Sequence, residues 1–190
     1  MSPRPFIAQQ MRPEQTLAQW IHDADRAIAQ RDAGSGPGIA RLDQIAGKTG
    51  LEQMQAMLRG DAPSPHISHT MDFCLVEVAA GHAVFQGTPQ LKHYNPLGSV
   101  HGGWYATLLD SAVGCAVHTM MPVGRAYTTA QLSVNIVRAA SAKSGPLRAI
   151  GTVVHCGRQL ATAEGRIVDA EGKLYAHAST TCLVFEMPKA

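Results

Sequence analysis

The sequence predicts an α+β protein in which an antiparallel β-sheet wraps around one long central helix, with a helical extension at the N-terminus. The first observation is the run of residues 104–121, which reads as a helix that is apolar on all sides, as buried helices are. The second is that short apolar or alternating runs lie before and after this helix, with turn residues between them. The third is a change in character after about residue 48, which sets an N-terminal segment apart.

Asp110 is the unusual residue of the predicted central helix. The helix ends at Pro122 and Gly124, and it is too short and too polar at its ends to span a bilayer. Carboxylates are almost never fully buried unless they are paired, hydrogen-bonded or used in chemistry. From Asp110 alone, a structural role such as pairing with an arginine is as well supported as a catalytic role.

The strands follow from alternation and from turn signals such as Ser-Gly-Pro and Glu-Gly. They are expected at residues 73–79, 83–87, 126–137, 147–156, 160–169 and 174–186. A short helix is expected at residues 50–59, with a Leu-Met stripe that favours core packing. This order of elements predicts a meandering antiparallel sheet around the long helix.

The N-terminal segment carries its own pattern. Residues 12–31 have apolar positions at helical spacing, and residues 32–38 have the composition of a flexible linker. We therefore expect residues 1–48 to be an extension and residues 49–190 to be the main domain. The pattern leaves open whether the extension's helix docks on its own domain or on a partner subunit.

Composition limits the classes of function. The net charge of +2 is too small to indicate binding to nucleic acid or to a membrane surface. The N-terminus has no secretory pattern, so a cytoplasmic protein is expected. The four cysteines (Cys74, Cys115, Cys156 and Cys182) are widely spaced, which favours reduced thiols, and we expect no metal and no redox cofactor. The sequence contains no Walker loop, no dinucleotide-binding glycine motif and no Gly-x-Ser-x-Gly elbow.

The polar loop before the central helix carries the candidate chemistry. Gly102 and Gly103 allow a carbonyl group to approach the free N–H groups at the helix N-terminus, where partial positive charge stabilises an oxyanion. Asn95 and His101 add two side chains that can hold a water molecule or a carbonyl. This combination suits the hydrolysis of an activated acyl group.

The spacing between the loop and the acid constrains how they work together. Gly102 and Asp110 are eight residues apart, which is about 12 Å along a helix axis, so one acyl carbon cannot touch both. If both act on one substrate, the acid comes from a second copy of the helix. That arrangement requires a two-fold dimer with antiparallel central helices and two composite sites.

The run Asn95-Pro-Leu-Gly-Ser-Val-His101-Gly102-Gly103, followed after six residues by Asp110, resembles the PaaI-type (phenylacetate-pathway) acyl-CoA thioesterases of the hotdog fold. The resemblance covers about residues 50–186. It implies that Asp110 is the general base or nucleophile and that the Gly102 amide polarises the thioester carbonyl. It further implies that Asn95 and His101 position substrate or water, with assistance from Thr129, and that the sites are shared in a homodimer or a dimer of dimers.

The resemblance implies that the turn at Gly157 and Arg158 meets the nucleotide end of the substrate, and Gly103 in the loop is a further candidate for substrate binding. CoA carries three phosphate groups, and the planar guanidinium of arginine binds phosphate well. A solvated turn arginine is an equally good reading of Arg158. Two other functions also stay open on this fold: an acyl-thioester dehydratase or hydratase, which the Asn–His-Gly-Gly–Asp spacing fits poorly, and a non-catalytic acyl-CoA-binding or regulatory protein.

Overall fold

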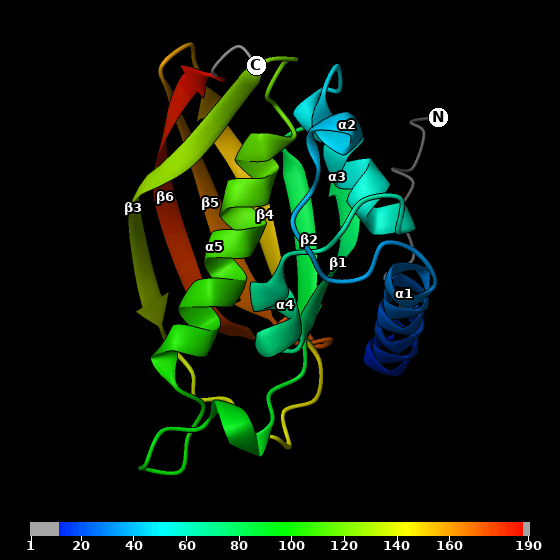
Figure 1. Ribbon diagram of the computed structural model, residues 1–190. Coiled ribbons are helices and arrows are strands. Elements are labelled where there is room, and N and C mark those ends of the chain that lie inside the picture. Colours follow the sequence, from blue (N-terminus) through cyan, green and yellow to red (C-terminus); the bar gives the residue numbers. More distant parts are fainter. Residues whose placement is uncertain (1–11, 188–190) are drawn as a thin grey trace, which may run out of the picture.

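The structure is a computed structural model that describes residues 12–187 of the chain. Its six-stranded antiparallel sheet has the strand order β1-β2-β4-β5-β6-β3 (Figure 1). The strands are β1 (Phe73–Ala79), β2 (His82–Gly87), β3 (Arg125–Ile136), β4 (Leu147–Cys156), β5 (Leu160–Val168) and β6 (Leu174–Glu186). The long helix α5 (Gly102–His118) lies along the inner face of the curved sheet. This is the hotdog architecture, as predicted.

Helix α5 forms the centre of the core. Its side chains that point into the sheet, including Leu108, Leu109, Ala112 and Val113, are 0% exposed. The close approach depends on Gly151 of β4, because a Cβ atom there would come within 2.2 Å of the Ala112 carbonyl oxygen. Burial of each large side chain among them contributes on the order of 1–3 kcal/mol to the free energy of folding. Helix α5 is therefore held firmly against the sheet.

The prediction that α5 is buried on all sides is wrong for the single chain. One side of the helix is only half-buried, because the sheet covers the opposite side. The half-buried residues of α5 are Gly102, Gly103, Ala106, Thr107, Asp110, Ser111, Cys115 and His118. The helix also ends at His118 rather than at residue 121, because the amides of Met120 and Met121 bond three residues back and tighten the last turn.

The remaining helices lie around the β1–β2 side of the sheet. They are α1 (Pro13–Ala33), α2 (Leu42–Ile45), α3 (Gly50–Arg59), α4 (His66–Thr70) and the 3₁₀ helix η1 (Leu91–His93). Of residues 32–38, which composition predicted as a flexible linker, Asp32 and Ala33 belong to α1, and residues 34–38 form backbone hydrogen bonds to Gly60 and Ser64 in the connection after α3. Between residues 12 and 187, no helix combines the length and the apolar character needed to cross a membrane.

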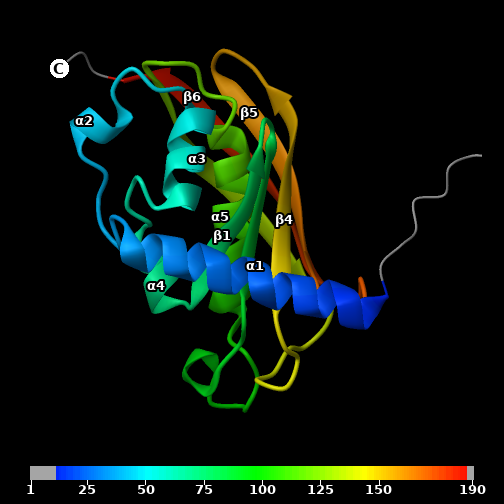
Figure 2. The same cartoon turned by 90° about the vertical axis from the view of Figure 1, so that its right-hand side faces the viewer.

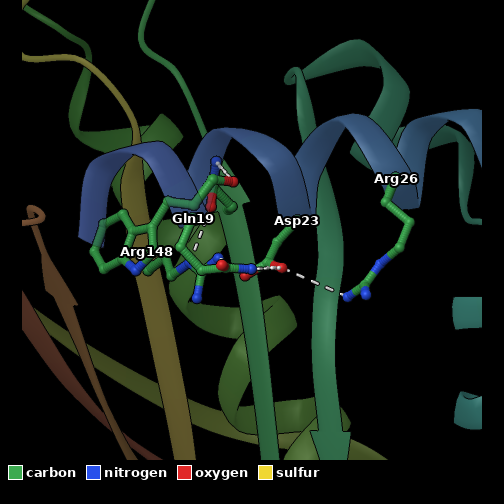
Figure 3. Close-up of polar contacts among 6 residues, drawn as sticks. Gln19, Asp23, Arg26 and Arg148 are labelled. Atoms are coloured by element: carbon green, nitrogen blue, oxygen red, sulfur yellow. Dashed lines mark hydrogen bonds and ion pairs between the residues drawn. The ribbon is translucent and has the colours of Figure 1, made fainter. Parts of the chain in front are cut away.

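Helix α1 lies across the outer face of β1, β2 and β4, on the side of the sheet opposite α5 (Figure 2). A polar cluster anchors it there (Figure 3). Arg148 of β4 donates to Asp23 at 2.8 Å and to Gln86 at 2.9 Å, and its guanidinium stacks over Trp20 at 4.6 Å. Burial raises the pKa of Asp23, but the hydrogen bonds from Arg148 and Gln19 outweigh it and hold this pKa below its usual value. The extension therefore docks on its own chain.

An Asp23→Ala variant is expected to lose about 3 kcal/mol of unfolding free energy, because it leaves the buried guanidinium of Arg148 without its counter-ion. Urea unfolding at a fixed protein concentration measures this loss. Asp25→Ala is the matched control, since Asp25 is an exposed carboxylate on the same helix. Equal losses in the two variants would contradict an anchoring role for the Asp23–Arg148 pair.

Candidate active site

The start of α5 presents one free backbone amide. His101 is the N-cap residue, and its Nδ1 accepts a hydrogen bond from the Gly103 N–H at 2.8 Å. The next amide, of Trp104, donates to the His101 carbonyl at 3.0 Å. Within residues 12–187, no hydrogen bond uses the Gly102 N–H. Of the two glycine amides predicted to meet substrate, Gly103 is thus already engaged, and Gly102 is the one open to an acceptor.

The glycine at position 103 is required by the cap itself. A Cβ atom at Gly103 would lie 2.9 Å from the Nδ1 atom of His101, closer than such contacts allow. The His101 side chain can therefore lie over the start of the helix only because Gly103 has no side chain in its way. This gives a steric reason for the second glycine of the His-Gly-Gly run.

Asn95 closes the loop that precedes α5. Its Oδ1 accepts from the amides of Leu97 (2.9 Å) and Ser99 (3.3 Å), and its Nδ2 donates to the Ser99 hydroxyl at 3.0 Å. The backbone N–H of Asn95 also bonds the Ser99 carbonyl, so residues 93–101 form a small hairpin. In the single chain the Asn95 side chain thus shapes the loop, and one of its Nδ2 hydrogens remains for another acceptor.

Asp110 lies half-buried in the middle of α5 and has no cationic partner. Its Oδ1 accepts a hydrogen bond from the Thr129 hydroxyl of β3 at 3.2 Å. None of the ion pairs found among residues 12–187 includes Asp110. The alternative that this acid pairs with an arginine therefore has no support within the described chain.

The side chains around Asp110 are held neutral. Burial, together with the charge of Asp110, raises the pKa of the Cys115 thiol to about 12, so Cys115 is not a thiolate nucleophile at neutral pH. Burial likewise raises the pKa of Tyr127 well above its usual value. Tyr127 lies two residues before Thr129 on β3, and sequence reasoning did not single it out.

The acid and the free amide do not meet within one chain. Gly102 lies beside Ile136, the last residue of β3, whereas Asp110 contacts Thr129 near the beginning of that strand. The helix places about 12 Å between them along its axis. The structure thus brings Asp110 and Thr129 together, and places His101, Gly102, Gly103 and Asn95 together at the other end.

Gly157 and Arg158 form the turn between β4 and β5. The Gly157 N–H donates to the Leu160 carbonyl at 2.8 Å, and the Arg158 carbonyl accepts from the guanidinium of Arg125. The side chain of Arg158 is exposed. Strand pairing connects this turn, through Ala161 and Cys182, to Thr129, so Arg158 lies at the Asp110 end of the molecule.

Comparisons with known proteins place the chain in a family. The model of the thioesterase superfamily matches residues 97–176. A phenylacetic acid degradation-related protein from Ralstonia eutropha is 30% identical, with a TM-score of 0.62 over 68% of this chain and 97% of that chain. A mutant of the phenylacetic acid degradation protein PaaI from Thermus thermophilus is 27% identical, with a TM-score of 0.56 over 62% and 97% of the two chains.

A third solved structure is the smu.793 protein of Streptococcus mutans bound to acetyl CoA, at 26% identity and a TM-score of 0.56 over 62% of this chain and 92% of that chain. A search of curated proteins finds no match. The family model and the Ralstonia relative confirm the resemblance that the Asn95–Asp110 motif indicated. The chain belongs to the PaaI-type hotdog-fold proteins of the thioesterase superfamily.

Proposed function

We propose that this protein is an acyl-CoA thioesterase, which hydrolyses an acyl- or aryl-acyl-CoA thioester to the free acid and CoA. The observation that carries the proposal is the unpaired carboxylate of Asp110, fixed by Thr129 on the central helix of a thioesterase-superfamily fold. The free N–H of Gly102 supplies the second element of the site, a donor for an oxyanion. A thioester is already activated, so the reaction needs no metal or redox cofactor.

The chemistry follows from these groups in two possible forms. In the first, Asp110 takes a proton from water, the water oxygen adds to the thioester carbon, and the Gly102 N–H binds the oxyanion. The C–S bond then breaks, and the CoA thiolate takes the proton from Asp110. In the second, the Asp110 carboxylate attacks the carbon itself and expels the thiolate, and water hydrolyses the resulting anhydride. In both forms of the mechanism the Thr129 hydroxyl donates a hydrogen bond to Oδ1 of Asp110, which leaves Oδ2 for the reaction.

The proposed site is shared between two subunits. Strand β3 is an edge of the sheet, and none of its 12 residues is buried. A long exposed edge strand has unpaired backbone N–H and C=O groups, which can pair with a strand of another chain. Antiparallel pairing of two β3 strands about a two-fold axis would place the half-buried sides of the two α5 helices against each other. Each Gly102 N–H would then approach Asp110 of the partner subunit.

The test of the function is thiol release from a panel of acyl-CoAs, followed with a thiol reagent. The panel contains short, medium and long aliphatic chains, aryl-acetyl groups and an α,β-unsaturated acyl group. We expect CoA release from at least one of them. Binding of acyl-CoA without any thiol release would indicate a binding protein instead. Addition of water to the unsaturated substrate, with its thioester intact, would indicate a hydratase.

Arg158→Ala is expected to raise KM for the acyl-CoA several-fold and to leave kcat unchanged, if this exposed arginine meets a CoA phosphate. The comparison substrate is the same acyl group on N-acetylcysteamine, which lacks the nucleotide. Its kinetics should not change. An equal rise in KM for both substrates would show that Arg158 acts on the structure of the turn rather than on CoA.

A further inference from the structure

A buried histidine lies beneath the start of α5 and takes no part in the proposed chemistry. His93 of η1 is 6% exposed. Its Nδ1 accepts a hydrogen bond from the Gln90 N–H at 3.1 Å, so in the neutral ring the proton is on Nε2. The Nε2 atom lies 3.1 Å from the Asp72 carboxylate, which also pairs with Lys92 at 2.7 Å. The hydrogen bond from Gln90 thus fixes the ring at Nδ1, whereas the close contact between Nε2 and Asp72 lacks the alignment of a hydrogen bond.

Two contacts connect His93 to the helix that carries Gly102. The His93 carbonyl accepts a hydrogen bond from the His101 N–H at 2.8 Å, and His101 is the cap residue next to Gly102. The His93 ring also stacks on the indole of Trp104, with 5.8 Å between the ring centroids and 28° between the planes. Both contacts reach α5 within its first turn.

The indole of Trp104 also contacts the backbone next to Asp72. The Trp104 Nε1–H donates to the carbonyl of Met71 at 3.0 Å, one residue before Asp72. Asp72 has φ +52°, and among residues 12–187 it is the only residue other than glycine whose φ is positive. A backbone in this region costs energy for most side chains, and it persists where the surroundings hold it. The turn before β1, η1 and the start of α5 therefore form one tightly connected unit.

We propose that His93 is a positioning residue, whose neutral ring, held by the hydrogen bond from Gln90 and by its contacts with Trp104 and Asp72, holds the first turn of α5 so that the Gly102 N–H points at the oxyanion. The inference rests on the proposed function, because it assigns the amide a substrate. His93 does not touch the substrate, since its side chain is enclosed by protein. A polar ring is needed at this place because the Gln90 N–H at the start of η1 takes its Nδ1 as acceptor, which an apolar side chain could not supply.

Two substitutions of His93 separate the ring's hydrogen bond from its bulk. Asn places an oxygen near the position of Nδ1 and keeps an acceptor for the Gln90 N–H, whereas Leu fills the space and leaves that amide unpaired. We expect His93→Leu to lower kcat roughly ten- to a hundredfold with KM within about twofold, as a small displacement of a catalytic donor does. His93→Asn should return kcat to within about threefold of the wild type. Asp72→Asn, which keeps the carboxylate's size, should lower kcat in the same direction as Leu.

The position of the amide itself provides a second readout, which does not depend on turnover. In the ¹⁵N-labelled full-length protein, the Gly102 and Gly103 resonances, assigned sequentially by triple-resonance spectra, should move in His93→Leu and stay near wild-type positions in His93→Asn. His22→Leu on the exposed face of α1 is the matched control and should move neither. Unmoved Gly102 and Gly103 resonances, or an unchanged kcat in folded His93→Leu, would overturn the proposal.

The two readouts also separate this inference from the proposed function. If the wild type hydrolyses none of the acyl-CoA panel, the proposed function fails and the resonances alone decide the role of His93. If the wild type is active and the three variants keep its kcat, the function stands and the positioning role is refuted. A loss of kcat in His93→Leu with rescue in His93→Asn, together with the resonance shifts, supports both.

Discussion

Asp110→Asn is expected to lower kcat on the order of 10²- to 10⁴-fold while the protein keeps its fold, because the substitution removes the carboxylate that we propose as the proton acceptor. The change is nearly isosteric, and the asparagine oxygen still accepts from the Thr129 hydroxyl. Asp110 has no ion pair among residues 12–187, so no buried cation loses its counter-ion. Steady-state thiol release on the best substrate of the panel, with circular dichroism of the same sample, measures the effect.

The matched control for this prediction is Asp25→Asn, the same change at an exposed carboxylate of α1. It should leave kcat and KM at their wild-type values. A well-folded Asp110→Asn protein with near-normal turnover would remove Asp110 from the mechanism in both of its forms, as base and as nucleophile. The proposal would then have no proton acceptor at this place in the fold, because Cys115 and Tyr127 are held protonated.

The elements whose patterns are local were predicted well. The alternation and the turn residues place β1, β4 and β6 with the bounds that the structure has, and the Leu-Met stripe places α3 likewise. The short helices α2, α4 and η1 were not predicted. Helices of three to five residues have no periodicity to detect, and their conformation depends on tertiary packing.

The sequence predicted some of the contacts among the candidate site residues but not all of them. The hydrogen bond between Thr129 and Asp110 was expected and is present in the structure, whereas the catalytic roles of the two residues remain predictions. Asn95 was expected to position substrate or water, which remains a prediction, and its side chain also folds the hairpin. The sequence supports both uses, because an asparagine before Pro-Leu-Gly is also a turn signal. The contact of His93 with Asp72 is long-range in the chain, so no spacing rule predicts it.

The sharing of the site is the prediction on which the mechanism depends most, and two single-residue variants test it. Asp110→Asn lacks the acid, and Gly102→Pro lacks the amide hydrogen. Proline is well tolerated at the first position of a helix, which Gly102 occupies, and His101 already has the extended backbone that precedes a proline (φ −62°, ψ 138°). Gly102→Pro should cost about 10²- to 10³-fold in kcat, as the loss of an oxyanion donor does. Gly102→Ala keeps the N–H and is the matched control, expected to be active.

Unfolding and refolding the two inactive variants together, in equal amounts, makes about half of the dimers mixed. In each mixed dimer one site combines the intact Asp110 of one subunit with the intact Gly102 N–H of the other, and the second site lacks both. About a quarter of the wild-type activity should therefore return, although neither parent has it. If each subunit held a complete site, no subunit in the mixture would be intact and mixing would restore nothing. An absence of activity in a sample whose mixed dimers are seen by native mass spectrometry would refute the shared site. We expect activity to return because the acid and the amide lie far apart within one chain. Asp110 contacts Thr129 near one end of β3, and Gly102 lies beside Ile136 at the other end.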